Sequence, residues 1–260
     1  MSQERRGADE APERVVVVTG AASGIGAATA RRLAGPGVAL VLNTRANADG
    51  LANVAAEARD AGAAVETVLA DLTETGACAE IVARARARFG RVDQIVSNAG
   101  RAKKSVFGDF AAGDVAEAVA VNALPFASLV TAALDDLAGS PWGRVVAVSS
   151  FVAHAFGVND TLFPTTAAGK GALEALARSL AFQLAPTGTT VNCVAPGFTR
   201  KVGGHSALQE GAWDAAARAT PMGRIAEPDD VAAAIVFLLS REARHVTGQI
   251  LRVDGGLSLR

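Results

Sequence analysis

Three glycines, Gly20, Gly24 and Gly26, lie in the stretch TGAASGIGAA, directly after the apolar run VVVV. Glycine permits a tight turn and lets the backbone approach a pyrophosphate, whose charge is met by free N–H groups at the start of a helix. The stretch follows a predicted strand and opens a predicted helix, which is the context that this chemistry requires. The residues predicted to bind the phosphates of a dinucleotide are Gly20, Ser23, Gly24, Ile25 and Gly26.

Short runs rich in β-branched residues alternate along the chain with longer, alanine-rich helical patterns. Such alternation is typical of βαβ units that build a parallel sheet. The runs are almost continuously apolar, as expected for strands that are covered by helices on both faces. The seven predicted strands begin at residues 15, 38, 64, 92, 144, 189 and 249. The sequence thus predicts an α/β fold, a single Rossmann-type, doubly wound domain with a seven-stranded parallel sheet.

The chain has 260 residues, half of them hydrophobic, which is enough for one large core. Residues 1–13 are polar and charged, and we expect a flexible tail there, followed by the folded domain at 14–260. Residues 198–220 follow a predicted strand and show no clear periodicity. A long irregular segment at this place is typical of a lid over a substrate.

The composition disfavours several classes of partner. A net charge of −1 without a basic tract argues against binding to nucleic acid. The longest uninterrupted apolar run, VAAAIVFLLS from Val231, is too short to span a bilayer and indicates a buried helix. Cys78 and Cys193 are far apart and lack the spacing of metal ligands, so we expect buried thiols and no metal site. We therefore expect a soluble cytoplasmic protein with no membrane partner.

Several short motifs, in their order along the chain, resemble those of the short-chain dehydrogenase/reductase family. After TGxxxGxG come SNAG at 97–100, a serine pair at 149–150, a lysine at 170 and PG at 196–197. The resemblance covers residues 15–256 and implies a nicotinamide-dependent oxidoreductase similar to the 3-oxoacyl-(acyl carrier protein) reductase branch. The further cofactor contacts that it implies are Asp71, Leu72, Asn98, Ala99, Gly100, Lys170, Pro196, Gly197 and Thr199.

The end of the second predicted strand, VLNTR, bears on the choice of cofactor. An acidic residue there would accept hydrogen bonds from a free ribose 2′-hydroxyl and would repel a 2′-phosphate. This chain has Asn43, Thr44 and Arg45 instead. The Arg45 guanidinium can pair with a phosphate, so we predict NADPH, with NADH the less favoured alternative and Thr44 and Arg45 as the contacts.

The resemblance also implies a catalytic group of four residues. In the family a serine holds the carbonyl oxygen, a tyrosine donates the proton, a lysine binds the ribose and lowers the pKa of the tyrosine, and an asparagine holds a water. The matching positions in this chain are Asn122, Ser150, Thr166 and Lys170. Thr166 stands where the family has its tyrosine, and the chain contains no tyrosine at all. An aliphatic hydroxyl is far less acidic than a phenol, so Thr166 cannot act as the same acid.

Three accounts of the proton source remain open. In the first, Thr166, Ser150 and Lys170 hold a water, and Lys170 is the effective acid. In the second, His154 or Asp160 reaches in from the loop between Ser150 and Thr166. In the third, the chain binds a nucleotide or ligand without turnover and acts as a regulatory or structural protein. A degraded enzyme would tolerate loss of the lysine and asparagine as well, and the chain retains both.

The predicted substrate pocket is bordered by apolar side chains and two polar ones. These residues are Phe151, Phe156, Phe163, Phe198, Trp213, Lys201 and His205. They favour an apolar, polyketide-like or cyclic ketone. The resemblance keeps a carrier-linked 3-oxoacyl group open, and the basic residues at 101–104 would face its acidic carrier or the solvent. The helices predicted around 110–138 and 167–184 have small apolar faces, which together with the resemblance predict a homotetramer or homodimer.

Overall fold

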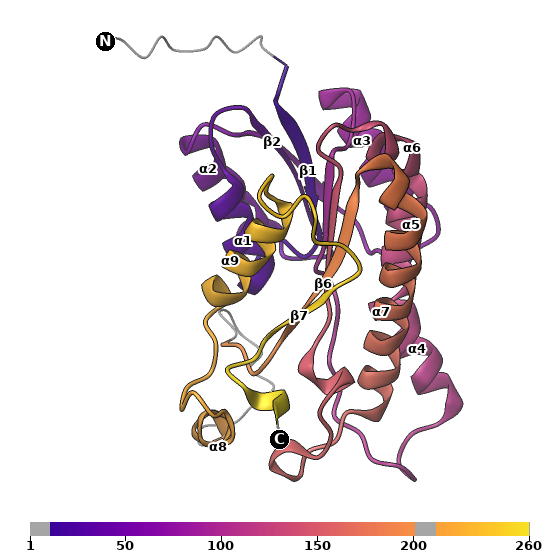
Figure 1. Ribbon diagram of the computed structural model, residues 1–260, viewed down its shortest axis with the longest axis vertical. Helices are drawn as coiled ribbons and strands as arrows, with labels where there is room; N and C mark the ends of the chain where they lie inside the picture. The colour runs from indigo at the N-terminus through magenta and orange to yellow at the C-terminus, as the bar shows by residue number, and fades with distance from the viewer. Residues whose placement is uncertain (1–10, 201–211, 260) are drawn as a thin grey trace.

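Seven parallel strands form one sheet in the order β3-β2-β1-β4-β5-β6-β7 (Figure 1). The computed structural model describes residues 11–200 and 212–259, and all the strands lie within these ranges. The strands are β1 (Arg14–Val18), β2 (Val38–Thr44), β3 (Ala64–Leu69), β4 (Gln94–Ser97), β5 (Arg144–Val148), β6 (Thr190–Pro196) and β7 (Ile250–Val253). The predicted fold class, strand number and parallel arrangement are confirmed.

Helices cover both faces of the sheet, as Figure 1 shows. The helices on one face are α1 (Gly24–Leu33), α2 (Ala48–Asp60) and α9 (Pro228–Leu239). Those on the other side are α3 (Ala77–Phe89), α4 (Ala112–Asn122), α5 (Leu124–Ala132), α6 (Leu134–Gly139) and α7 (Pro164–Leu184). Outside these layers lies α8 (Ala212–Ala219). The short 3-10 turns are η1 (Phe151–Ala153), η2 (Val158–Asp160), η3 (Ala185–Thr187) and η4 (Leu257–Leu259).

The sheet separates two hydrophobic cores, one on each face, and successive residues of β1 alternate between them. Val15 and Val17 pack under α3, α5 and α7, while Val16 and Val18 pack under α1, α2 and α9. All four side chains are fully buried. Alternate residues of a strand point to opposite faces, so a strand that is buried on both faces must be apolar at every position. This explains why the strands appear in the sequence as continuous runs.

The strand order reverses between β1 and β4, which are neighbours in the sheet. In an open parallel sheet, ligands bind beyond the carboxyl ends of the strands at such a reversal. Gly20 follows β1, Asn98 follows β4 and Ser149 follows β5, so residues from distant parts of the sequence meet at one edge. This edge is the lower one in Figure 1.

Two helices position the catalytic residues that the resemblance implies. Pro164 takes the first position of α7, where its missing N–H removes no helical hydrogen bond. Thr166 and Lys170 are one turn apart on α7, and both are buried because this side of the helix faces the sheet. Asn122 ends α4 at a break in the helix axis, and α5 begins two residues later with Pro125 at its second position.

The segment Ala112–Ala132, which joins α4 and α5, has the length and apolarity of a membrane span, with a mean hydropathy of 1.5. A third of it is buried in the fold. Phe126 and Leu129 lie in the core, and α4 packs along α7. These contacts account for much of its apolar composition.

The predicted tail and lid are described only in part. The tail prediction concerns residues 1–13, of which 1–10 lie outside the described residues. The lid prediction concerns residues 198–220, of which 201–211 lie outside them, Lys201 and His205 included. The last part of that segment is regular, since α8 occupies Ala212–Ala219.

Candidate active site

The turn after β1 has the open backbone that a pyrophosphate requires. Gly24 begins α1 with φ at +55°, and a Cβ atom at this position would meet nothing within 4 Å. Ser23 caps the helix without a side-chain hydrogen bond, so its side chain satisfies none of the first N–H groups of α1. Free N–H groups and the helix dipole favour an anion at this place. The predicted phosphate cradle therefore fits a dinucleotide.

Gly26 serves the turn in a different way. A Cβ atom on Gly26 would overlap the Gly20 carbonyl and would lie 2.7 Å from Asn98 Nδ2. The Asn98 side chain donates to the carbonyl oxygens of Thr19 (2.9 Å) and Gly20 (3.2 Å), and the Thr19 hydroxyl accepts from the N–H of Asn98 (3.0 Å). Asn98 thus ties β4 to the glycine turn and holds the cradle in shape.

A groove of about 620 Å³ reaches this turn at Ser23 and Gly24. It runs along α1 towards Pro228 and touches none of the predicted catalytic residues. This groove is therefore separate from the predicted catalytic residues.

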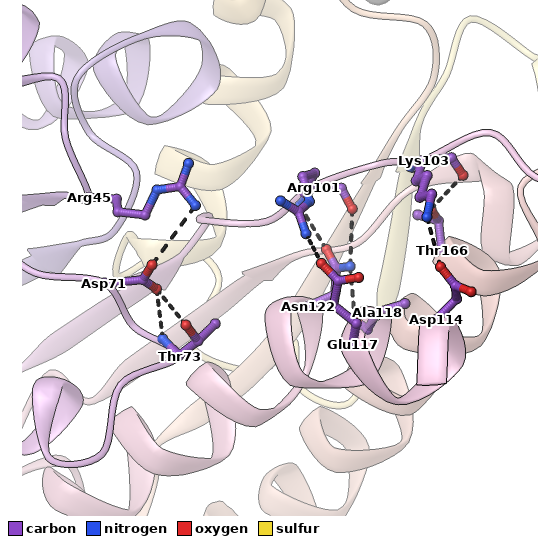
Figure 2. A network of polar contacts seen from close by, with 10 residues as sticks. All are labelled: Arg45, Asp71, Thr73, Arg101, Lys103, Asp114, Glu117, Ala118, Asn122 and Thr166. Carbon is purple, nitrogen blue, oxygen red and sulfur yellow. Dashed lines mark hydrogen bonds and ion pairs between the residues drawn. The ribbon is translucent and has the colours of Figure 1, made fainter. Parts of the chain in front are cut away.

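At the end of β2 only one strongly basic side chain is exposed. Asn43 is buried, and its amide donates to the carbonyl oxygens of Val68 and Ala70, at 3.2 Å each. Arg45 is the exposed residue, and its Nη1 lies 3.9 Å from Asp71 Oδ2 (Figure 2). The N–H and hydroxyl of Thr73 hydrogen bond to Asp71 and hold the pKa of this carboxyl below its usual range. A cation available for a 2′-phosphate thus stands beside an ionised Asp71.

Lys170 is buried at the end of β5. Its Nζ donates to the carbonyl oxygen of Val148 at 2.7 Å. Burial lowers the pKa of Lys170 to about 8, although the nearby Cys193 and Glu174 oppose the shift. A Cβ atom on Gly100 would lie 2.7 Å from Asn122 Oδ1 and 3.1 Å from Lys170 Nζ. The structure therefore brings Lys170, Asn122 and Gly100 together, and glycine leaves room for both side chains.

Asn122 holds the chain segment that follows Gly100. Its Oδ1 accepts from the N–H of Arg101 (3.1 Å), and its Nδ2 donates to the carbonyl oxygen of the same residue (3.0 Å), as Figure 2 shows. The same Nδ2 also donates to the carbonyl oxygen of Ala118 (3.0 Å). Each polar atom of the Asn122 side chain thus has a backbone partner, and the side chain locks the start of the segment to α4.

Thr166 holds the same segment two residues further on. Its Oγ1 accepts from the N–H of Lys103 (2.9 Å) and donates to the carbonyl oxygen of Lys103 (3.2 Å) (Figure 2). The residue is only 1% exposed. A hydroxyl has a single proton to donate, and this one is committed to Lys103. Thr166 can therefore accept a hydrogen bond from a water, but it cannot donate a proton while this contact persists.

The segment held by Asn122 and Thr166 is also tied to α4 by ion pairs. Arg101 pairs with Glu117, and Lys103 pairs with Asp114 at 2.8 Å (Figure 2). Asn122 and Thr166 border a cavity of about 20 Å³ beside this segment. Such a volume admits about one water molecule and no aromatic ring.

Ser150 caps the η1 turn at the end of β5. Its Oγ accepts weakly from the N–H of Val152 (3.4 Å), which leaves the hydroxyl proton free to donate. Ser149 points away from this position. Its hydroxyl donates to Glu174 Oε1, and His154 Nε2 contacts the same oxygen at 2.9 Å. Ser150 thus has a hydroxyl proton to offer, whereas that of Ser149 is taken by Glu174, and Ser150 as the carbonyl-binding residue stays a prediction.

Three phenylalanines of the predicted substrate pocket lie in one apolar cluster. The rings of Phe151 and Phe198 pack with their centroids 4.7 Å apart, and Phe163 joins the same cluster. Phe156 is 72% exposed and lies outside this cluster. Pro196 ends β6, and a Cβ atom on Gly197 would lie 2.8 Å from Asp254 Cα, so glycine permits the close approach there. The Thr199 hydroxyl donates to the Gly197 carbonyl oxygen (3.1 Å).

Two residues of this region were not predicted from the sequence. Glu174 is 7% exposed and lies one turn beyond Lys170 on α7. The sequence could have indicated this residue, because it lies four positions after Lys170 and therefore on the same, buried side of the helix. Thr19 is the other, and its hydroxyl accepts from the N–H groups of Asn98 and Ala99.

Comparison with known proteins gives a consistent result. The sequence profile described as enoyl-(acyl carrier protein) reductase matches residues 20–258. The chain is 39% identical to a cis-4-hydroxycyclohexanecarboxylate dehydrogenase of Sinomonas cyclohexanicum, over 94% of this chain and 96% of that protein. It is 33% identical to the monensin polyketide synthase putative ketoacyl reductase of Streptomyces virginiae, over 95% of this chain and 98% of that protein.

A solved structure adds to this similarity. The angucycline C-6 ketoreductase LanV, crystallised with bound NADP, superimposes with a TM-score of 0.87. The two chains are 29% identical, and the match covers 96% of this chain and 97% of LanV. The similarity therefore extends over the whole fold and includes the edge that carries the candidate site.

Proposed function

The chain belongs to the short-chain dehydrogenase/reductase family of oxidoreductases, which act on alcohols and carbonyls, and we propose that it reduces a ketone with NADPH. The observation that carries this proposal is the buried Lys170 ammonium beside Asn122 and Gly100, at the edge of the sheet that holds the phosphate cradle. Bound NADPH supplies the hydride that reaches the carbonyl carbon.

Each polar residue of the site has a separate task in this proposal. The free hydroxyl proton of Ser150 hydrogen bonds to the carbonyl oxygen and stabilises the negative charge that develops on it. Lys170 keeps one N–H on Val148 and has two left, one for a ribose hydroxyl and one for a water. Asn122 and Thr166 hold residues 101–103 in place beside the lysine.

The proton comes from Lys170 in this scheme. The ammonium gives it to the water, the water gives one to the alkoxide oxygen, and the neutral amine regains a proton from solvent. Thr166 could hold this water only as an acceptor, because its own proton is committed to Lys103. His154 is less suited than Lys170 to act as the direct donor, because its Nε2 is bound to Glu174.

The preference for NADPH rests on Arg45, with the NADP bound to LanV as support by similarity. Replacing Arg45 by Ala should lower kcat/KM for NADPH by about ten- to a hundredfold, because a hydrogen bond to a charged group contributes roughly 1.5–3 kcal/mol. The value for NADH should stay unchanged. Arg59→Ala on α2 removes an exposed arginine from another site and serves as the control. Steady-state kinetics with both nucleotides decides the matter, and equal losses with NADH and NADPH would rule out recognition of the 2′-phosphate.

The proposed substrate is an apolar cyclic or polyketide-like ketone. Phe151, Phe163 and Phe198 form an apolar wall beside Ser150. One relative is named as a dehydrogenase of a hydroxycyclohexanecarboxylate, and another as a putative ketoacyl reductase of a polyketide synthase. A carrier-linked 3-oxoacyl group is less favoured. Arg101 and Lys103 are already paired with carboxylates of α4, which leaves less free positive charge for an acidic carrier.

We also propose that the chain forms a homotetramer or a homodimer. Leu124 on α5 is 52% exposed and Phe182 on α7 is 87% exposed. Large exposed apolar side chains on helices with few charges favour association with a second copy. Light scattering at several protein concentrations measures the oligomeric state directly.

The proposal predicts that the natural chain oxidises NADPH in the presence of a ketone from a panel of cyclohexanone acids, decalones and 3-oxoacyl thioesters. The measurement is the decrease in NADPH absorbance, with identification of the alcohol by mass spectrometry. Nucleotide affinity is measured in parallel by the quenching of intrinsic fluorescence. Affinity for NADPH without turnover of any panel member would favour the alternative, a binding protein with a regulatory role.

A further inference from the structure

A buried carboxylate bridges the two ends of the turn that carries Ser150. Glu174 Oε1 accepts from the Ser149 hydroxyl, just before the turn, and contacts His154 Nε2 at 2.9 Å, just after it. Only 9% of the Glu174 side chain and 15% of the His154 side chain are exposed. One oxygen atom on α7 thus joins the first and last residues of a six-residue turn, 149–154.

The backbone of this turn is short, and hydrogen bonds hold it at its start, from Ser149 N–H to Val194 O (2.7 Å), and at its end, from Ala155 N–H to Phe151 O (2.9 Å). Ala153 N–H donates to the Ser150 carbonyl oxygen (3.2 Å), and His154 N–H donates to that of Phe151 (2.9 Å). Ser150 caps the turn through one long contact of 3.4 Å with Val152. A 3-10 turn of three residues has little stability of its own, so the orientation of Ser150 depends on what fixes the two ends of the turn.

Glu174 is suited to fix those ends because its own position is rigid. It lies in the middle of the 21-residue helix α7, between the fully packed Leu173 and Ala177. Within residues 11–200 and 212–259, His154 is the only basic side chain that contacts this carboxylate. A buried carboxylate is costly unless hydrogen bonds satisfy it, so the contacts with Ser149 and His154 are strongly favoured over open arrangements.

We propose that Glu174 is a positioning residue of the reductase site, which orients Ser150 towards the substrate carbonyl by joining Ser149 to His154. The inference rests on the proposed function for its catalytic consequence, but the restraint on the turn is independent of turnover. Glu174 itself touches neither substrate nor cofactor in this assignment. It acts through the turn, and its effect on the reaction passes through Ser150.

Two variants of Glu174 separate the contacts from the packing. Glu174→Leu keeps the bulk and removes both acceptor oxygens, while Glu174→Gln keeps one acceptor oxygen that both partners can reach. We expect Leu to lower kcat by about tenfold, since small misplacements of a catalytic group cost up to a hundredfold. Gln should restore kcat to within about threefold of the natural chain. Glu80→Gln, an exposed change on α3, is the control and should have no effect.

A double-mutant cycle with Ser150→Ala tests whether the effect passes through Ser150. Ser150→Ala alone should lower kcat by about a hundredfold, as for other donors to a developing oxyanion. In the Glu174→Leu variant, the further change Ser150→Ala should lower kcat by no more than about tenfold, because the two residues act as a unit. Additive losses in the cycle would overturn the proposal, because they would show that Glu174 acts on something other than Ser150.

Hydrogen exchange gives a readout that does not need turnover. In Glu174→Leu the amides of Ala153, His154 and Ala155 should exchange about tenfold faster, while the amides of β5 stay protected. His154→Leu removes the contact between His154 and Glu174 and should speed up exchange at the same amides. This variant replaces Glu174→Leu in the experiment if Glu174→Leu fails to fold. Unchanged exchange at 153–155, or equal loss of protection throughout β5, would refute the restraint. If the natural chain reduces no ketone, the proposed function fails while this comparison still decides the role of Glu174.

Discussion

Replacing Lys170 by Met should lower kcat for ketone reduction by about a thousandfold, since a positioned general acid contributes typically 10²–10⁴-fold. The proposed scheme has no other acid, because the chain contains no tyrosine and the Thr166 proton is bound to Lys103. Methionine fills most of the same buried space. The measurement is single-turnover reduction at saturating NADPH, with nucleotide affinity determined separately.

The pH dependence follows from the same residue. Burial lowers the pKa of Lys170 to about 8. The ammonium is the acid form, so kcat/KM for reduction should fall as the pH rises through about 8, and the rate of alcohol oxidation should rise over the same range. The Lys170→Met variant should lose this dependence. Arg88→Met, which removes an exposed cation from α3, is the control. A Lys170→Met variant that retains a tenth of the activity or more would exclude Lys170 as the proton source.

Replacing Thr166 by Tyr should impair the protein rather than restore a better acid. Thr166 is 1% exposed, and its hydroxyl accepts a hydrogen bond from the Lys103 N–H and donates one to the Lys103 carbonyl oxygen. The adjoining cavity of about 20 Å³ cannot hold a phenol ring. Loss of two hydrogen bonds at about 1 kcal/mol each and overpacking at about 1–3 kcal/mol predict a free energy of unfolding lower by about 3–5 kcal/mol. Displacement of residues 101–103 should also lower kcat at least tenfold.

Two smaller changes separate the hydroxyl from the size of the residue. Thr166→Val has nearly the same shape but leaves the N–H and carbonyl of Lys103 without a partner, at a cost of about 2 kcal/mol. For a domain of this size, this corresponds to a decrease in Tm of about 4–8 °C. Thr166→Ser keeps the hydroxyl and should stay close to the natural chain. Thermal unfolding and ketone reduction are measured on all three variants. A gain of turnover in Thr166→Tyr would show that the missing phenol limits the reaction, and the proposed relay through Lys170 would be wrong.

Much of the fold could be predicted because the relevant physics is local. Strands buried on both faces must be apolar throughout, so β1 and β2 are evident as runs of valine and leucine. The phosphate turn was equally clear, because only glycine allows the close approach at Gly26 and the left-handed backbone at Gly24.

The direction of side chains could not be predicted in the same way. Asn43 and Arg45 are two residues apart at the end of one strand, yet the amide of Asn43 is consumed by the carbonyl groups of Val68 and Ala70. Phe156 was predicted to border the substrate pocket, but it is 72% exposed. In both cases the outcome depends on which neighbouring strand or loop offers a partner, and those neighbours are distant in the sequence.

The sequence by itself determined that this protein is a doubly wound α/β chain with a glycine turn for a dinucleotide, a lysine that matches the family's catalytic lysine, and no tyrosine to accompany it. These properties depend on residue type and spacing along one helix or strand. The tertiary structure decided what Thr166 does, because its hydroxyl meets a backbone segment 63 residues away, at Lys103. It likewise decided that Glu174 joins Ser149 to His154. A hydroxyl or a buried carboxylate takes whichever partner the fold brings within reach, and the order of residues does not specify that partner.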